Sequence, residues 1–85
     1  MDNEQRKVED LNKEHSKLIG AVVRLTREVK FSEENNPFKG CVGVIKEVTF
    51  LSPTDSVPYL VKWFDTRLRN YWVGMEEIEV LHEEG

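Results

Sequence analysis

The segment Lys62–Trp72 holds the residues of this chain that are best suited to binding chemistry. It reads KWFDTRLRNYW and contains three cations, one anion and four aromatic residues, a local charge of +2 in a chain of net charge −4. Aromatic rings interleaved with arginine suit stacked bases and phosphates, and they equally suit protein contacts dominated by Trp, Tyr and Arg. Both interpretations remain open at this stage. The candidate binding residues are Lys62, Trp63, Arg67, Arg69, Tyr71 and Trp72, together with Phe38 from an earlier loop.

Strand alternation limits how many of these rings can be buried. Either Trp63 or Phe64 fills the interior, with Tyr71 or Trp72 facing it across a tight hairpin, so we expect at least one ring to face solvent. Arg67 and Arg69 share parity, and no acidic residue lies between Thr66 and Met75. We therefore expect both arginines on one solvent face without a local acidic partner.

Catalytic and metal-binding patterns are weak in this sequence. His15 and His82 lie at opposite ends of the chain, and we expect both to be solvated. Cys41 stands between glycine and valine, which favours a buried structural thiol rather than an activated nucleophile. The sequence contains no phosphate-binding, nucleophile-elbow or clustered metal-ligand motif. We expect a protein without catalytic residues, cofactor, metal or small-molecule substrate.

The size and composition point to one small domain. The chain has 85 residues, of which 39% are hydrophobic and 33% charged, and such a domain has a modest core. The net charge of −4 argues against general coating of nucleic acid. We expect a cytoplasmic protein, because the single cysteine fits a reducing compartment and the charged start Met1–Lys7 has no apolar run behind it.

Residues 19–81 show the alternation of short β-strands. The first expected strand covers Val23 to Phe31, and the second covers 40–51 with a parity switch at Lys46–Glu47 that predicts a β-bulge. Three further strands are expected at 59–65, 71–74 and 78–81, with one helical turn before the last. Five short strands predict a mainly β fold, a small barrel whose closure protects its edges.

Residues 1–18 predict an N-terminal helix with a thin apolar stripe of Val8, Leu11 and Leu18, interrupted by His15. Asp2 and Gln5 can form a capping box, and Gly20 is a plausible stop. Such a helix is marginal alone. It is either a solvated helix or a docking or dimerising seam. Residues 82–85 are expected to form a short acidic tail.

Two other segments each allow a purely structural and a functional interpretation. The loop Ser32–Lys39 is long for so small a domain, and its Phe38 either caps an open end of the barrel or makes a contact. Acidic residues gather near the C-terminus, where they form a solvated face or a patch for a basic partner. They are Glu76, Glu77, Glu79, Glu83 and Glu84.

The pattern of Gly40, Gly43, Ile45 and Val48 in GCVGVIKEV resembles that of SH3-like barrels of the KOW and Tudor kind. The resemblance covers residues 19–81 and implies that these glycines turn the chain out of the first loop and bend the second strand. Glycine suits this place because it tolerates positive φ and lets another backbone approach closely. We therefore expect Gly43→Val to cost roughly 1–3 kcal/mol.

The strand YLVKW at Tyr59–Trp63 is similar to a chromodomain strand. In chromodomains the corresponding tryptophan belongs to an aromatic cage for methylated lysine, and only Trp63 can be carried over from that cage. The other cage positions correspond to Thr66 and to Cys41–Val42.

Two classes of function follow from these features. The first is a small non-enzymatic module that acts by protein–protein interaction, as an adaptor, subunit or inhibitor of a larger enzyme, including one that processes nucleic acid. The alternative is a nucleic-acid-associated KOW/Tudor-type regulator that contacts nucleic acid through residues 62–72. Salt separates them, because counterion release makes nucleic-acid binding fall steeply with salt.

Overall fold

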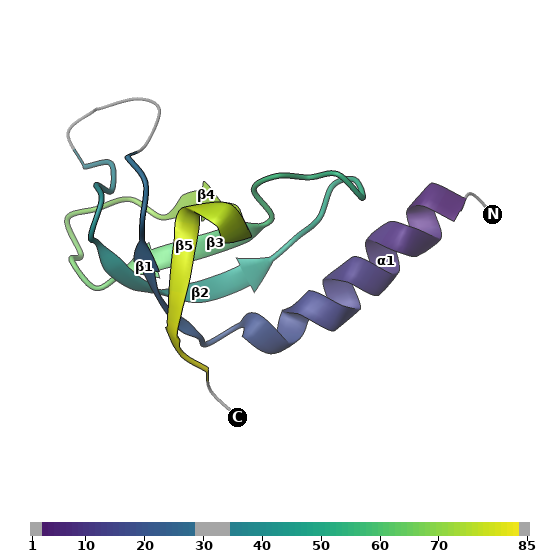
Figure 1. Ribbon diagram of the computed structural model, residues 1–85, viewed down its shortest axis with the longest axis horizontal. Coiled ribbons are helices and arrows are strands. Elements are labelled where there is room, and N and C mark those ends of the chain that lie inside the picture. Colours follow the sequence, from purple (N-terminus) through teal and green to yellow (C-terminus); the bar gives the residue numbers. More distant parts are fainter. Residues whose placement is uncertain (1–2, 29–34, 84–85) are drawn as a thin grey trace.

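A computed structural model describes residues 3–28 and 35–83. One helix precedes five short strands (Figure 1). The helical elements are α1 (Asn3–His15), the 3₁₀ turn η1 (Ser16–Leu18) and the 3₁₀ turn η2 (Met75–Glu77). The strands are β1 (Val22–Leu25), β2 (Val42–Val48), β3 (Tyr59–Trp63), β4 (Tyr71–Val73) and β5 (Ile78–His82).

The five strands form one antiparallel sheet in the order β4-β3-β2-β1-β5. The expected mainly β fold with five strands and an N-terminal helix is therefore confirmed. Within the described residues, the edge strands β4 and β5 each pair with one neighbour and not with each other. The sheet is not closed by hydrogen bonds, so the expected barrel is not confirmed.

The predicted β-bulge in the second strand is confirmed. Ile45 lies opposite Val61, and Glu47 lies opposite Leu60, so the register shifts and Lys46 is the extra residue of β2. A bulge of this kind bends a strand and increases its twist. It also explains why the apolar residues of β2 change parity at this point.

Alternate residues of each strand face a single core. Tyr59, Val61 and Trp63 point inward from β3, because the residues between them are more exposed. Most of the core comes from the sheet, while the helical segment contributes only Leu18. The buried cluster consists of Leu18, Ala21, Val23, Leu25, Cys41, Ile45, Tyr59, Val61, Trp63, Val73 and Ile78.

The first strand is shorter than expected. β1 ends at Leu25, and the expected continuation through Glu28 is wrong, because residues 26–28 are not part of a strand. The Thr26 amide donates to the carbonyl of Glu77, just before β5. Val29 and Phe31 of the expected strand lie outside the described residues. At the other end of the fold, β5 includes His82, which the sequence placed in the acidic tail.

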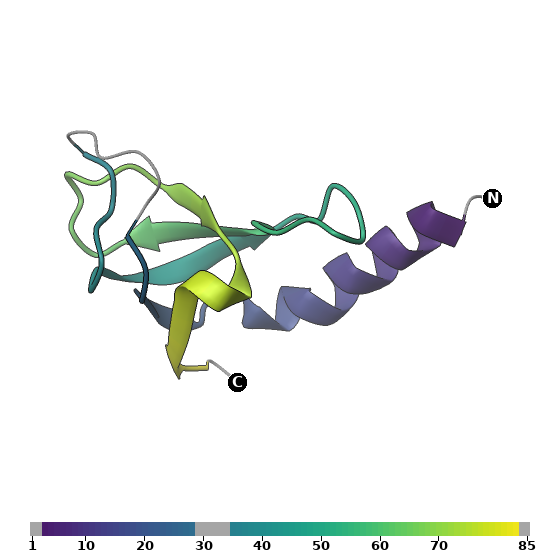
Figure 2. The same cartoon turned by 45° about the horizontal axis from the view of Figure 1, so that its top comes forward.

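Helix α1 extends away from the sheet, and its last turns rest against the β2–β3 loop (Figures 1 and 2). The side-chain amide of Asn12 holds the backbone of Phe50, accepting from its N–H at 2.6 Å and donating to its carbonyl at 3.4 Å. The chain leaves the helical segment at Gly20, whose φ is 95°. The predicted cap residue Asp2 lies outside the described residues.

His15 is not solvated, contrary to expectation. Its Nδ1 lies 2.7 Å from the Tyr59 hydroxyl in a hydrogen bond, and its ring packs against Phe50 with centroids 5.1 Å apart. The same helical stripe that carries Leu11 turns His15 toward the sheet. The helix is therefore docked on the domain by side chains from its C-terminal half.

Candidate functional site

The structure divides the seven predicted binding residues among four places. Lys62 and Trp72 lie on the solvent side of the sheet, while Trp63 lies in the core. Tyr71 is half-buried and packs against the core from the inner side of β4. The other three lie in loops: Phe38 between β1 and β2, and Arg67 and Arg69 between β3 and β4. The segment Lys62–Trp72 is thus not one continuous surface.

Trp63 is not available for surface contact. Only 2% of its surface is exposed, and it points inward together with Val61. Its indole Nε1 has no hydrogen-bond partner among the described residues. The alternation of β3 therefore makes Trp63 the interior ring. The prediction that Trp63 belongs to a surface site or an aromatic cage is wrong, because the ring is buried.

The neighbouring aromatic residues face solvent, as the sequence predicted for at least one ring. Phe64 is 61% exposed, and its amide donates to the carbonyl of Val42 at 3.0 Å, just beyond β3. Trp72 is 40% exposed on the edge strand β4. Trp72 and Lys62 share the side of the sheet that faces away from the core, and Phe64 lies just beyond the end of β3.

We call this side of the sheet the outer face. Its centre lies where Val44 of β2 is directly opposite Lys62 of β3, and where Leu60 of β3 is directly opposite Trp72 of β4. Four of its aliphatic side chains remain half-buried rather than covered. The outer face consists of Val22, Arg24, Val42, Val44, Glu47, Leu60, Lys62, Trp72 and Glu79.

An apolar notch opens beside Trp72. It has a volume of about 330 Å³ and is lined by Thr49, Leu51, Asp55, Val57 and Trp72. The Asp55 carboxylate fixes the conformation of the β2–β3 loop, because it accepts hydrogen bonds from the amides of Leu51 and Val57, each at 3.0 Å. The notch therefore presents mainly apolar surface, since its one charged group is engaged with the backbone.

The charges on the outer face are unevenly compensated. Arg24 forms an ion pair with Glu79, and the Glu47 carboxylate accepts a hydrogen bond from the Thr49 hydroxyl at 3.0 Å. Lys62 has no ion-pair partner within the described ranges, and it stands among aliphatic neighbours. Lys46, in the bulge beside Glu47, is also exposed. Arg24 and Lys62 thus balance Glu47 and Glu79 in number across the outer face, and Lys62 is the cation of this face without an ion-pair partner among the described residues.

The expectation that Arg67 lacks an acidic partner is wrong. Asp65 accepts from Arg67 Nε at 3.0 Å and from its terminal nitrogen at 2.8 Å. These hydrogen bonds lower the pKa of Asp65 to about 2. The segment also turns, because the Leu68 amide donates to the Asp65 carbonyl, so the shared parity of Arg67 and Arg69 has no meaning here.

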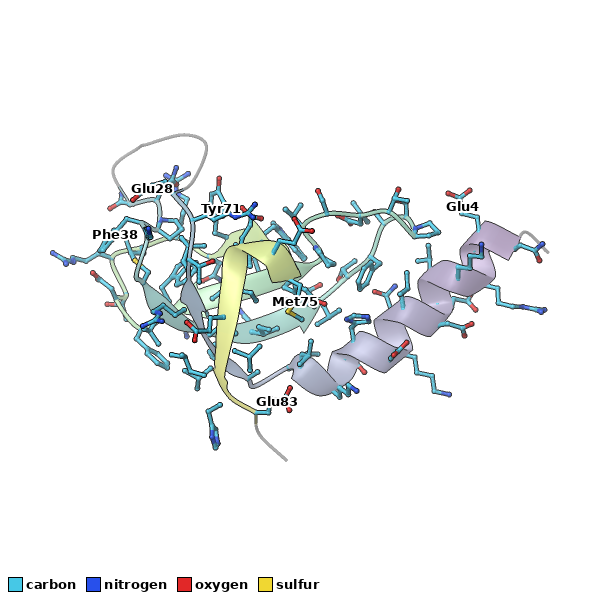
Figure 3. The ribbon with its side chains drawn as sticks, viewed as in Figure 1. Glu4, Glu28, Phe38, Tyr71, Met75 and Glu83 are labelled. Carbon is cyan, nitrogen blue, oxygen red and sulfur yellow. The ribbon has the colours of Figure 1, made fainter. Side chains whose placement is uncertain are left out.

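The β3–β4 loop is joined to the β1–β2 loop by a hydrogen bond, in which the Arg69 amide donates to the Asn35 carbonyl. Phe38 is 57% exposed and lies at the end of the molecule opposite the start of α1 (Figure 3). The residue of this loop that is buried is the neighbouring Pro37, not Phe38. Cys41 is buried as predicted, and its Sγ accepts from the Phe38 amide at 3.3 Å.

A second hollow, between α1, the β2–β3 loop and η2, was not predicted. Its volume is about 560 Å³, and its walls include His15, Phe50, Tyr59 and Met75. Burial raises the pKa of Tyr59, whose hydroxyl is engaged with His15. Two of its polar groups, the His15 imidazole and the Tyr59 hydroxyl, thus attach the helix, and its lining also includes Arg27, Asp55, Glu76 and Glu77. The only signal in the sequence was the position of His15 on the stripe of Leu11.

The described residues contain no group of three or more His, Cys, Asp or Glu side chains that could hold a metal ion. Among the same residues, no helix combines the length and apolar character needed to cross a membrane. Comparisons with protein-family models, with curated proteins and with solved structures found no match for this chain. The functional interpretation therefore rests on the outer face itself.

Proposed function

We propose that this chain is a small non-enzymatic binding module that acts by protein–protein interaction, as an adaptor, subunit or inhibitor of a larger protein. The outer face is its contact surface. The observation that carries the proposal is the exposed ring of Trp72 beside half-buried aliphatic residues and the unpaired Lys62. Protein interfaces concentrate their binding energy in such aromatic residues, with apolar surroundings that exclude water.

The fold proposed for the module is an SH3-like barrel of the KOW and Tudor kind, in the cytoplasm. The support is the bulge in β2 and the single 3₁₀ turn that leads into β5. The glycines of the resemblance have two separate uses. Gly40 adopts a φ of 98°, and Gly43 lies where the backbone of β3 passes closely.

The alternative function, a nucleic-acid-associated regulator, is favoured by one observation. The exposed Phe64 ring lies at the end of β3, and Lys62 and Arg69 have no ion-pair partner among the described residues. Rings with nearby cations can stack on bases and hold phosphates. This function requires binding to a single-stranded oligonucleotide that falls steeply between low and physiological salt. Protein docking through apolar residues falls much less.

Site-specific photo-crosslinking tests the proposal. A photoreactive amino acid replaces Val44 at the centre of the outer face, and in a control it replaces Met75, which is 44% exposed on η2. We expect protein adducts from position 44 in extracts of the source cells and none of the same size from position 75. Equal adducts from both positions contradict the proposal. Adducts that disappear with nuclease support the alternative.

A further inference from the structure

The outer face also specifies the chemistry of its partner. Resting on the function proposed above, we infer that the partner is a protein segment that places an apolar side chain in the notch beside Trp72 and a carboxylate on Lys62. The carboxylate and the apolar side chain lie on the same side of that segment, two or four positions apart. The inference thus names an acidic, apolar protein segment as the ligand.

The apolar part follows from the notch. Leu51, Val57 and Trp72 expose apolar surface to one hollow of about 330 Å³, and the Asp55 carboxylate in its wall is engaged by two backbone amides. A polar side chain in this hollow would find few groups with which to pair, and burying it unpaired costs free energy. An aliphatic or aromatic side chain fits the lining.

The acidic part follows from Lys62. This ammonium group stands between the aliphatic residues Val44 and Leu60 and has no ion-pair partner among the described residues. A partner that covers the face removes water from Lys62, and an unpaired charge in such a place is costly. A carboxylate from the partner restores its hydrogen bonds. Glu47 forms no ion pair with Lys62, and its carboxylate instead accepts a hydrogen bond from the Thr49 hydroxyl.

The spacing of the two features follows from the register. Leu60 lies directly opposite Trp72, and Lys62 lies two residues further along β3, so Lys62 and Trp72 are diagonal neighbours on the face. Such neighbours are about 7–8 Å apart. Two residues of an extended segment span about 7 Å. The notch extends beyond Trp72, because its wall residue Thr49 donates its amide to the carbonyl of Pro58, four residues before Lys62. An apolar residue two or four positions away from Asp or Glu therefore matches the face.

The same charges disfavour two other occupants. A second copy docked symmetrically about the centre of this face would bring Lys62 close to its own copy, and both chains carry a net charge of −4. Nucleic acid would meet Glu47 and Glu79 on this face, and the single ring of Trp72 gives successive bases no row of rings on which to stack. A protein segment meets neither obstacle.

Selection from a random peptide library displayed on phage tests the inference on the full chain. The baits are the wild-type chain, Lys62→Glu and Trp72→Ala, with Lys7→Glu and Met75→Ala as controls. Lys7 is an exposed residue of α1 outside the hollows described above, and Met75 lies off the outer face (Figure 3). Circular dichroism confirms that each bait is folded before selection, and selected peptides are synthesised for affinity measurements.

We expect wild type and both controls to enrich peptides that carry an apolar residue two or four positions from Asp or Glu. The Lys62→Glu bait should weaken these peptides at least fivefold and should instead enrich Lys or Arg at the acidic position. Trp72→Ala should weaken them at least tenfold. Together these three results support the inference.

Other outcomes overturn it in distinguishable ways. Peptides that depend on Trp72 but keep the same acidic residues with Lys62→Glu refute the inference and leave the proposed function standing. Peptides that bind Trp72→Ala as well as wild type, or no enrichment on any bait, refute both. Sedimentation that shows a wild-type dimer lost in Trp72→Ala identifies a second copy as the occupant, and salt-sensitive capture of a single-stranded oligonucleotide identifies nucleic acid. Either result refutes the inference.

Discussion

Replacing Gly43 by alanine should destabilise the sheet through a steric clash at its centre. A Cβ on Gly43 would lie 2.6 Å from the Lys62 carbonyl oxygen, 2.8 Å from Val61 Cγ1 and 3.0 Å from Trp63 Cα. Two of these three atoms belong to the backbone of β3, which cannot rotate away as a flexible side chain does. β2 and β3 would have to move apart where Gly43 pairs with Trp63.

The expected loss is about 2 kcal/mol in the free energy of unfolding, within the range of about 1–3 kcal/mol typical of overpacked sites. For a domain of this size that loss lowers the melting temperature by roughly 8–16 °C. Gly43→Val should cost at least as much. Urea and thermal unfolding followed by circular dichroism and by tryptophan fluorescence measure both variants.

Gly40 supplies the comparison, because its penalty has a different cause. A Cβ there meets nothing within 4 Å, but the φ of 98° is strained for a side chain. Gly40→Ala should lose about 1–2 kcal/mol, and Gly40→Asn should recover much of it, since Asn tolerates positive φ. No such recovery is expected for Gly43→Asn. An unfolding free energy of Gly43→Ala within about 0.5 kcal/mol of wild type would refute the close approach of β3.

Three further predictions concern the turn and the helix. In carboxyl NMR titrations the pKa of Asp65 should be near 2, and in Arg67→Ala it should move toward 3.8. Because the folded pKa is lowered, the ion pair stabilises the fold above about pH 3.8 and loses this effect as the pH falls through 2. Asn12→Ala should cost about 1–3 kcal/mol in urea unfolding, because the half-buried amide of Phe50 loses its acceptor; an unchanged midpoint would contradict the docking of α1. Deletion of residues 1–17 should leave a β domain that unfolds cooperatively at a lower temperature, and loss of cooperativity would place the helix within the core unit.

Local alternation predicted much of the sheet. The parity of Tyr59, Val61 and Trp63 and the switch at Lys46–Glu47 placed the third strand and the bulge, because side chains of a strand alternate between two faces. The same alternation could not choose between Trp63 and Phe64, since both neighbours are apolar. That choice depends on which face the rest of the sheet covers.

The remaining features depend on contacts that local patterns do not encode. Asn12 and His15 reach partners 38 and 44 residues away, so neither contact was visible in the helical stripe. The pairing of Arg67 with Asp65 was missed because only the stretch from Thr66 to Met75 was considered for an acidic partner, and Asp65 lies one residue before it. The outer face required the register of three strands, which fixes the position of Lys62 relative to Trp72.

The role of the outer face can be measured by calorimetry, in which the partner protein identified by photo-crosslinking is purified and titrated into wild type, Trp72→Ala and Met75→Ala. Trp72 and Met75 are similarly exposed, at 40% and 44%, but only Trp72 lies on the outer face. We predict that Trp72→Ala weakens binding at least tenfold, about 1.4 kcal/mol, and that Met75→Ala leaves the affinity within twofold of wild type. Equal affinities for wild type and Trp72→Ala, or equal losses in both variants, would contradict the assignment of binding to the outer face.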